Sequence, residues 1–229
     1  MPKAPDQLTP LIDGDIIVYS AGFAAQTKGI VQPVQNALSN AKHMLGSIFE
    51  VCGEPEEGKI YLTGKDNYRI KAAITHPYKG NRKSDKPEHY TAIREYLINV
   101  WGAIVIDGME ADDAMGINQT EETCICTIDK DLDMIMGWHY NWRKGKKYWV
   151  TQEEADYSFH LQMLTGDAVD NIKGIRGVGP KKAEKVLVGL DFGERLIKIK
   201  EMYQSHFGDA WKTRYYENEK LLWILREPL

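Results

Sequence analysis

The chain has 229 residues, of which 43% are hydrophobic and 27% charged, as expected for a globular protein with one sizeable core and a small appended subdomain. Residues 1–10 contain no apolar signal-peptide core, and residues 98–106, the most apolar stretch, are too short to span a bilayer, so we expect neither secretion nor membrane insertion. The three cysteines argue against a disulfide framework and favour a reducing, cytoplasmic location, while the net charge of −4 at first argues against a nucleic-acid partner.

The first half of the chain predicts alternating strands and helices. Three short apolar stretches have the composition of buried strands: residues 8–13, 59–63 and 102–106. Two stretches between them predict helices: residues 33–51 and 87–101. The first strand ends at Asp13, and Asp15 is the expected N-cap of the helix that follows. This order indicates an α/β fold with a mostly parallel sheet flanked by helices.

Residues 66–87 differ from their surroundings because they are basic and aromatic and have little apolar periodicity. Two tyrosines alternate with cationic side chains along this segment: Tyr68, Arg69, Tyr78, Lys79, Arg82 and Lys83. Aromatic rings can stack on bases while cations pair with phosphates, so the segment is a candidate nucleic-acid contact. A solvated basic loop is the alternative, and it is favoured if the segment is considered alone.

Residues 108–133 contain two acidic clusters on either side of a short strand formed by the second half of residues 121–128. The carboxylates of the two clusters are Glu110, Asp112, Asp113, Asp129 and Asp131. In a helix, Glu110 and Asp113 share one face. On an extended backbone, Asp129 and Asp131 point the same way. Because open α/β sheets bind ligands at the carboxyl ends of their strands, we expect these groups to lie in one layer with Asp13.

Several carboxylates in one pocket repel one another unless cations lie among them. An all-oxygen ligand set without a nearby His or Cys favours Mg²⁺ or Mn²⁺ over Zn²⁺. Each acidic cluster also has a structural explanation, as a helix N-terminus or a turn, and taken alone that explanation is the stronger one. If eight acidic side chains bind metal, the remaining acidic residues no longer outnumber the 29 basic ones, so net charge does not decide against nucleic acid.

The second half of the chain predicts a hairpin followed by helices. Residues 138–150 form the hairpin, and Thr151 with Glu154 forms a capping box that begins a helix to about residue 164. Another helix begins at Gly179-Pro180 and ends near residue 189. Residues 192–229 are helical, with aromatic side chains that we assign to the core.

The loop before the helix at Pro180 is rich in glycine. Gly177 and Gly179 allow close approach of the backbone and expose amides at a helix N-terminus, beside Lys181 and Lys182. This pattern predicts a phosphate-binding cradle within a helix–hairpin–helix motif over residues 159–189.

Six strings together resemble the flap endonuclease and 5′→3′ exonuclease family, which has a PIN/FEN-like fold. The family includes the 5′-nuclease domain of bacterial DNA polymerase I and the stand-alone exonucleases of tailed bacteriophages, and the phage members look most similar. The strings occur in the family's order: residues 12–14, 78–82, 110–113, 128–131, 166–171 and 174–182.

The resemblance implies a role for each matching residue. One metal ion is held by Asp13, Glu110 and Asp112, with Asp113 in support, and a second is served by Asp129, Asp131, Asp167 and Asp170. Lys79 and Arg82 match basic residues of a helical arch over residues 66–101, which a single-stranded 5′ end passes through or under. We expect these two residues to act in catalysis and Tyr78 beside them to bind DNA. Duplex DNA is held at the helix–hairpin–helix by Gly177, Gly179, Lys181 and Lys182, with K⁺ on loop carbonyls.

The chain departs from the family pattern at position 64. The family usually has a metal-site aspartate just after the second strand, where this chain has Gly64, and the nearest carboxylate is Asp66. Either Asp66 takes that role from a shifted backbone, or the first metal ion has one ligand fewer.

We therefore expect an α/β nuclease core over residues 1–150, including the arch, and a helical region over residues 151–229. The expected activity is two-metal hydrolysis of DNA phosphodiesters by Mg²⁺ or Mn²⁺, as a 5′→3′ exonuclease or a structure-specific 5′ flap endonuclease. We expect a monomer that acts on duplex DNA with a 5′ end or flap, with RNA/DNA hybrids as a further substrate, in the cytoplasm (of the host cell if it is phage-encoded). The alternative is a non-catalytic DNA-binding module of the same fold with a degenerate metal site.

Overall fold

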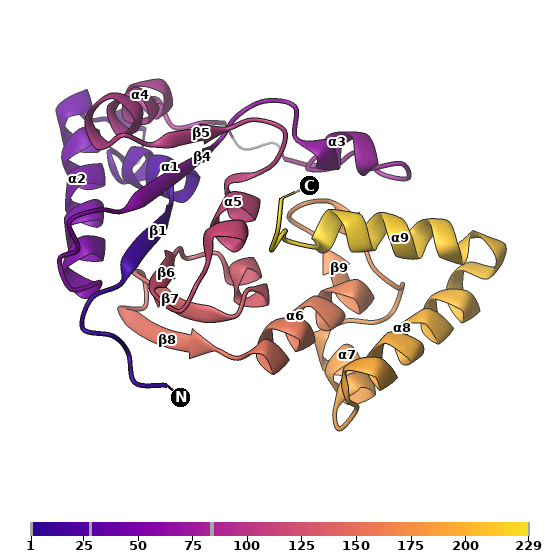
Figure 1. The fold of residues 1–229 in the computed structure, drawn as a ribbon. Helices are drawn as coiled ribbons and strands as arrows, with labels where there is room; N and C mark the ends of the chain where they lie inside the picture. Colours follow the sequence, from indigo (N-terminus) through magenta and orange to yellow (C-terminus); the bar gives the residue numbers. More distant parts are fainter. Residues whose placement is uncertain (1, 28, 83–84, 229) are drawn as a thin grey trace. The chain divides into compact units, whose positions relative to one another are not determined.

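The computed structural model describes residues 2–27, 29–82 and 85–228, so Lys83 lies outside the described part. The chain forms two compact units (Figure 1). The first comprises residues 1–65, 84–150 and 225–229, and the second comprises residues 66–83 and 151–224. The basic segment at 66–82 thus groups with the C-terminal helices, whereas the helix after it groups with the sheet.

A six-stranded sheet forms the centre of the first unit, in the order β5-β4-β1-β6-β7-β8. All neighbouring strands are parallel except the β7–β8 hairpin. The strands are β1 (Thr9–Asp13), β4 (Lys59–Thr63), β5 (Ile104–Ile106), β6 (Thr123–Cys126), β7 (Gly137–Asn141) and β8 (Lys146–Val150). The predicted fold class, a mostly parallel sheet flanked by helices, is confirmed.

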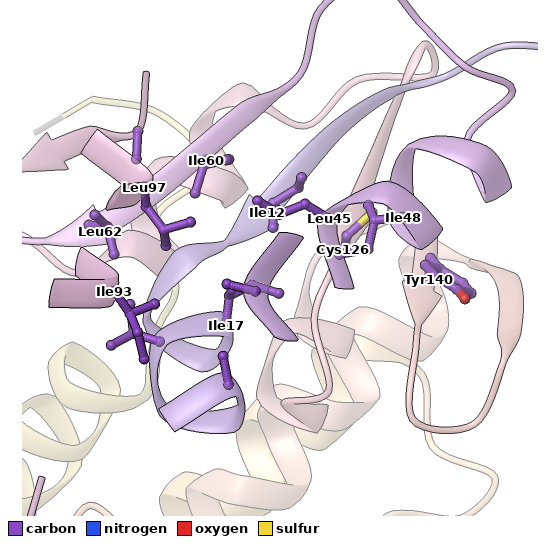
Figure 2. Close-up of a cluster of buried hydrophobic side chains, with 14 of the residues drawn as sticks. Ile12, Ile17, Leu45, Ile48, Ile60, Leu62, Ile93, Leu97, Cys126 and Tyr140 are labelled. Atoms are coloured by element: carbon purple, nitrogen blue, oxygen red, sulfur yellow. The ribbon is translucent and has the colours of Figure 1, made fainter. Parts of the chain in front are cut away.

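Helices cover this sheet because its strands alternate apolar side chains between two faces. The helical elements are α1 (Gly14–Ala24), α2 (Val34–Val51), α4 (Tyr90–Trp101), α5 (Ala111–Asn118) and the 3₁₀ turn η1 (Lys130–Met134), and a short β2–β3 ribbon (Gln26–Thr27, Ile30–Val31) follows α1. Ile12 of β1 packs with Ile17 of α1, Leu45 of α2 and Leu97 of α4 in the buried core (Figure 2). Helix α5 packs against β1 and β4.

Two local predictions at the sheet edge are wrong. The N-cap of α1 is Asp13, whose Oδ1 accepts the Ile16 N–H at 3.0 Å, whereas Asp15 Oδ2 accepts the N–H of Thr63 at 3.0 Å. The backbone after Asp129 is not extended, because Asp129 caps η1 by accepting the Asp131 N–H at 3.0 Å. In both cases an aspartate at or shortly after the end of a strand accepts a backbone N–H two or three residues further on.

The second unit is mainly helical. Its elements are α3 (Tyr68–Ala72), α6 (Gln152–Thr165), β9 (Gly166–Asp167), β10 (Ile172–Lys173), α7 (Pro180–Leu187), α8 (Phe192–Phe207), the 3₁₀ turn η2 (Gly208–Ala210) and α9 (Trp211–Leu222). The predicted capping box of Thr151 and Glu154 begins α6, and Pro180 is the first residue of α7, as expected.

Buried charges attach the basic segment to α9 within this unit. Glu217, 5% exposed, accepts the N–H groups of Ile74 and Thr75 at 2.7 Å each and pairs with Arg214 at 3.1 Å. Arg69, 2% exposed, donates to the carbonyls of Leu221 and Trp223 at 3.0 and 2.6 Å. These contacts fix the backbone that leads into residues 76–82.

Removal of Glu217 should therefore destabilise the protein strongly. We expect Glu217→Ala to lower the free energy of unfolding by about 3 to 5 kcal/mol, because it breaks the buried ion pair with Arg214 and removes the acceptor of two part-buried backbone amides. Glu201→Ala, which removes an exposed partner of Lys198, is the matched control and should cost less than about 1 kcal/mol. Urea denaturation measures both, and equal small losses would show that Glu217 does not anchor the segment.

Candidate functional site

Asp13 is the buried carboxylate at the carboxyl end of the central strand β1. It is 3% exposed, and besides capping α1 it accepts the Thr127 hydroxyl at 2.8 Å on Oδ2. Thr127 follows β6, the strand next to β1, and its own Oγ1 accepts the Asp129 N–H at 3.0 Å. Through Thr127, the ends of β1 and β6 therefore connect Asp13 to the turn at Asp129, as the sequence predicted.

The surroundings of Asp13 oppose its negative charge. Burial raises the pKa of Asp13 to about 7; the charges of Asp15 and Asp129 also raise it, while hydrogen bonds from Ile16 and Thr127 act in the opposite direction. Near neutral pH such a carboxyl group binds either a proton or a cation. An oxygen-only donor set with this property fits a hard divalent ion.

The acidic cluster at residues 110–113 lies at the start of α5. Glu110 is the N-cap, 8% exposed, and it forms a capping box with Asp113, whose Oδ2 accepts the Glu110 N–H at 3.1 Å. Asp113 is fully buried, and its Oδ1 accepts the Leu225 N–H at 3.0 Å. Asp112 lies in the same first turn and is partly exposed. Both carboxylate oxygens of Asp113 thus accept backbone N–H groups, and the roles of Glu110, Asp112 and Asp113 at a metal ion stay predictions.

The start of α5 is attached to the edge of the sheet through β4. The Ala111 N–H donates to Thr63 Oγ1 at 3.0 Å, and Thr63 is the last residue of β4. Strand β4 pairs with β1, which ends at Asp13. Asp131 and Asp129, both partly exposed, lie on the turn after β6 on the other side of β1. The first unit therefore carries its predicted carboxylates at the end of β1 and at the starts of the helical elements α5 and η1, which follow β5 and β6.

Gly64 follows β4, and no side chain fits there. A Cβ at position 64 would collide with the Asp107 carboxylate and with the Ile106 carbonyl. Asp107 Oδ1 accepts the Lys65 N–H at 2.7 Å, so this carboxylate is held in the space that a residue-64 side chain would need. Sequence reasoning missed Asp107, although an acidic residue directly after the strand at 104–106 was a signal for it.

Asp66 lies in the second unit and is exposed, with a φ of 60° in the left-handed region. It is not the cap of α3, because that position belongs to Asn67, whose side chain accepts the Arg69 N–H at 2.9 Å. A metal role for Asp66 stays a prediction.

Three residues predicted to contact DNA converge on Asp170 within the second unit. The Tyr78 hydroxyl donates to Asp170 Oδ2 at 2.8 Å, Arg82 Nη2 lies 2.6 Å from Oδ1, and Lys79 Nζ lies 3.7 Å from Oδ2. The Lys79 N–H also donates to the Asp170 carbonyl at 2.9 Å. Asp167 Oδ1 accepts the N–H groups of Val169 and Asp170 at 2.6 and 3.3 Å, so it shapes the loop that carries Asp170.

The glycine-rich loop that was predicted to bind phosphate leads directly into α7. Gly177 has a φ of 80°, which favours glycine, and Gly179 is the N-cap of α7 without a side-chain cap. Lys181 and Lys182 are exposed at this helix N-terminus. A hollow of about 470 Å³ lies beside the loop, lined among others by Lys173, Arg176, Gly177 and Gly179.

Among the described residues, every helix is too short or too polar to cross a membrane. No family model matches the chain. Curated relatives are similar to most of it: DNA polymerase I of Thermus caldophilus is 26% identical over 87% of the chain, and DNA polymerase I of Bacillus caldotenax is 28% identical over 86%. These matches cover 27% and 26% of the polymerases, so the chain spans about a quarter of their length.

Solved nuclease structures share the fold. A flap endonuclease of bacteriophage T5, in a pseudo-enzyme–product complex with DNA and metal ions, matches with a TM-score of 0.59 at 14% identity, over 94% of this chain and 99% of that one. A T5 5′-exonuclease with bound divalent zinc ions gives 0.57 at 14% identity, over 95% and 100%. The catalytic core of Rad2 with a DNA substrate gives 0.55 at 17% identity, over 94% and 73%. The chain thus resembles the polymerases in sequence and these nucleases in fold. This is the resemblance to the flap endonuclease and 5′→3′ exonuclease family that its motifs predicted.

Proposed function

We propose that the chain is a divalent-metal-dependent nuclease that hydrolyses DNA phosphodiesters from a 5′ end, as a 5′→3′ exonuclease or a 5′ flap endonuclease. The observation that carries this proposal is the buried Asp13 carboxylate at the end of β1, with acidic loops after the nearby strands β5 and β6. The similarity to 5′ nucleases that bind metal ions and DNA supports it.

The chain's own residues would prepare the metal site. Asp13, Glu110 and Asp112 would hold one ion, with Asp113 orienting Glu110 through the capping box. For a second ion, the first unit offers Asp129 and Asp131. When bound, two divalent ions supply an activated water and stabilise the leaving oxygen, with Mg²⁺ or Mn²⁺ as the hard ions that suit these ligands.

The basic residues of the second unit would bind the DNA. Lys79 and Arg82 both pair with Asp170, whose single negative charge balances only one of their two positive charges, so a phosphate group would compete with Asp170 for them. Tyr78 adds an aromatic surface beside them. At the glycine-rich loop, Gly177, Gly179, Lys181 and Lys182 would contact phosphates of the duplex as a helix–hairpin–helix, with K⁺ on the loop carbonyls. The protein would act as a monomer.

A second candidate function is DNA binding without catalysis. The observation that favours it is Gly64, where Asp107 fills the space of a further side chain. A site with one ligand fewer binds its metal ion less tightly, and a degenerate site would leave only the DNA contacts.

Cleavage assays decide between the two functions. With Mg²⁺, the protein should cleave both a 5′-labelled flap and a blunt duplex, and with EDTA it should cleave neither. Asp131→Ala and Asp112→Ala should abolish hydrolysis and leave DNA affinity largely intact. Asp133→Asn is the matched control on the same turn and should stay active, since Asp133 accepts the Tyr148 hydroxyl at 2.7 Å and an amide oxygen can replace it. Binding of both substrates without cleavage would establish the non-catalytic alternative.

The raised pKa of Asp13 predicts how the metal-free protein responds to pH. Between an ordinary value of 3.8 and about 7, the folded state binds a proton that the unfolded chain has lost, so stability falls as the pH rises, by roughly 4 kcal/mol at most. Asp13→Asn keeps an oxygen for the Ile16 N–H and should remove this decrease. Urea denaturation in EDTA at pH 5 and pH 8 measures this decrease in stability. Addition of Mg²⁺ should restore the stability of the wild type at pH 8. An identical pH dependence in wild type and variant would contradict the account.

The two basic regions should differ in their effects. Lys79→Ala should lower the single-turnover rate at saturating DNA far more than it weakens binding, because its charge would act on the developing negative charge at the phosphate. Lys181→Ala with Lys182→Ala should mainly weaken binding and reduce the salt slope by about one unit per lost phosphate contact. Lys185→Ala, farther along α7, serves as the control. An effect of Lys79→Ala on affinity alone, or an unchanged salt slope in the double variant, would refute these roles.

A further inference from the structure

All three cysteines of the sequence meet in the core of the first unit. Cys52 is the C-cap residue of α2, and Cys124 and Cys126 lie two residues apart on one face of β6. Their Sγ atoms all lie within 4.8 Å of one another, and those of Cys52 and Cys126 are 3.9 Å apart. The side chains are 1%, 0% and 0% exposed, and Figure 2 shows Cys126 beside Ile48 of α2.

Buried cysteines often serve only as small apolar side chains. Two features of this cluster go beyond that role. First, Cys52 lies more than 70 positions from Cys124 and Cys126 in the sequence, yet the fold brings all three thiols together. Second, each of the three sulfur atoms has the other two as neighbours. Three sulfur atoms around one point are the ligand set that thiophilic metal ions select.

The spacing of the sulfur atoms fits such an ion. A zinc–sulfur distance of about 2.3 Å in tetrahedral geometry places two thiolates roughly 3.8 Å apart. The 3.9 Å between Cys52 and Cys126 matches this spacing, and the other pairs need to move by less than about 1 Å to reach it. The surrounding core is apolar, so hard ions that retain water would not enter.

The local charges also fit. The Lys147 ammonium, which donates to the Val51 carbonyl at 3.1 Å, lies close enough to favour the thiolates of Cys52 and Cys124. Hydrogen bonds from Cys124 and Cys126 lower the pKa of Cys52, whereas burial raises the pKa of Cys126. The pKa of Cys124 is also raised: its hydrogen bond with Cys126 lowers it, but the hydrogen bond with Cys52 and burial together outweigh that effect. Three thiolates, one divalent ion and one ammonium group have no net charge, which removes the main penalty for burying the ion.

We propose that Cys52, Cys124 and Cys126 bind one thiophilic divalent ion of the zinc group as three thiolates, at a site separate from the carboxylates. On binding, three metal–sulfur bonds form, and each cysteine that still carries a thiol proton loses its S–H bond and releases that proton to solvent. The ion would join the end of α2 to β6, the strand that leads into the Asp129 turn. The site provides three ligands from the chain, one fewer than a closed zinc site.

Titration with Cd²⁺ tests the proposal, because the thiolate-to-metal charge-transfer absorption reports sulfur ligands and does not report carboxylates. The complete chain, freed of metal and kept reduced without air, should develop this band to saturation at one equivalent of Cd²⁺. Excess Mg²⁺ should not remove it. Zn²⁺ should abolish it by competition and should raise the midpoint of thermal unfolding.

Apolar variants that lack the sulfur atom identify the ligands. Cys52→Val and Cys126→Val should each weaken Cd²⁺ binding by more than about tenfold and lose the Zn²⁺-dependent rise in the unfolding midpoint. Asp131→Ala should keep the full band, so failure of the nuclease assignment and failure of this site are distinguishable. If neither valine variant folds, protection of the wild-type thiols from alkylation by one equivalent of Cd²⁺ replaces them. No band in the wild type, a band that survives in both variants, or unprotected thiols would overturn the proposal.

Discussion

The burial of one carboxyl group at the end of the central strand is the constraint on which the candidate site depends. Asp13 ends β1, between β4 and β6, and it both caps α1 and accepts the Thr127 hydroxyl. Such a group is stable only when it is protonated or beside a cation. The same burial that makes the metal-free fold less stable at neutral pH makes the site ready to bind a divalent ion, so stability and the proposed function oppose each other there.

In the second unit, charges are paired within the protein. Glu217 and Arg214 fix the backbone that enters the basic segment, and Asp170 pairs with Lys79 and Arg82 where that segment ends. The basic residues are thereby held in place on a loop that has little apolar periodicity of its own. Their charge becomes available only to a partner that competes with Asp170, which is what a phosphate group can do.

The first unit offers two kinds of ligand that suit different ions. Hard carboxylate oxygens lie on the loops at the carboxyl edge of the sheet, whereas soft sulfur atoms lie inside the core between α2 and β6. Because ligand softness separates these classes of ion, the two proposed sites would prefer different metals. Beside Gly64, the space that a side chain at position 64 would need is filled by the carboxylate of Asp107, which sequence analysis did not identify.

Hydrophobic periodicity and local spacing in the sequence determined the α/β class, the positions of the main strands and helices, and the carboxylates that follow the strands, because these features depend on neighbouring residues. The capping box at Thr151 and the helix start at Pro180 are local in the same sense. Only the tertiary structure decided that Asp13 rather than Asp15 caps α1, because that choice depends on Asp15 having Thr63 as a partner. It also decided that Lys79 meets Asp170 and that Cys52 meets Cys126, since contacts between residues so far apart in sequence depend on the path of the folded chain and leave no local pattern in the sequence.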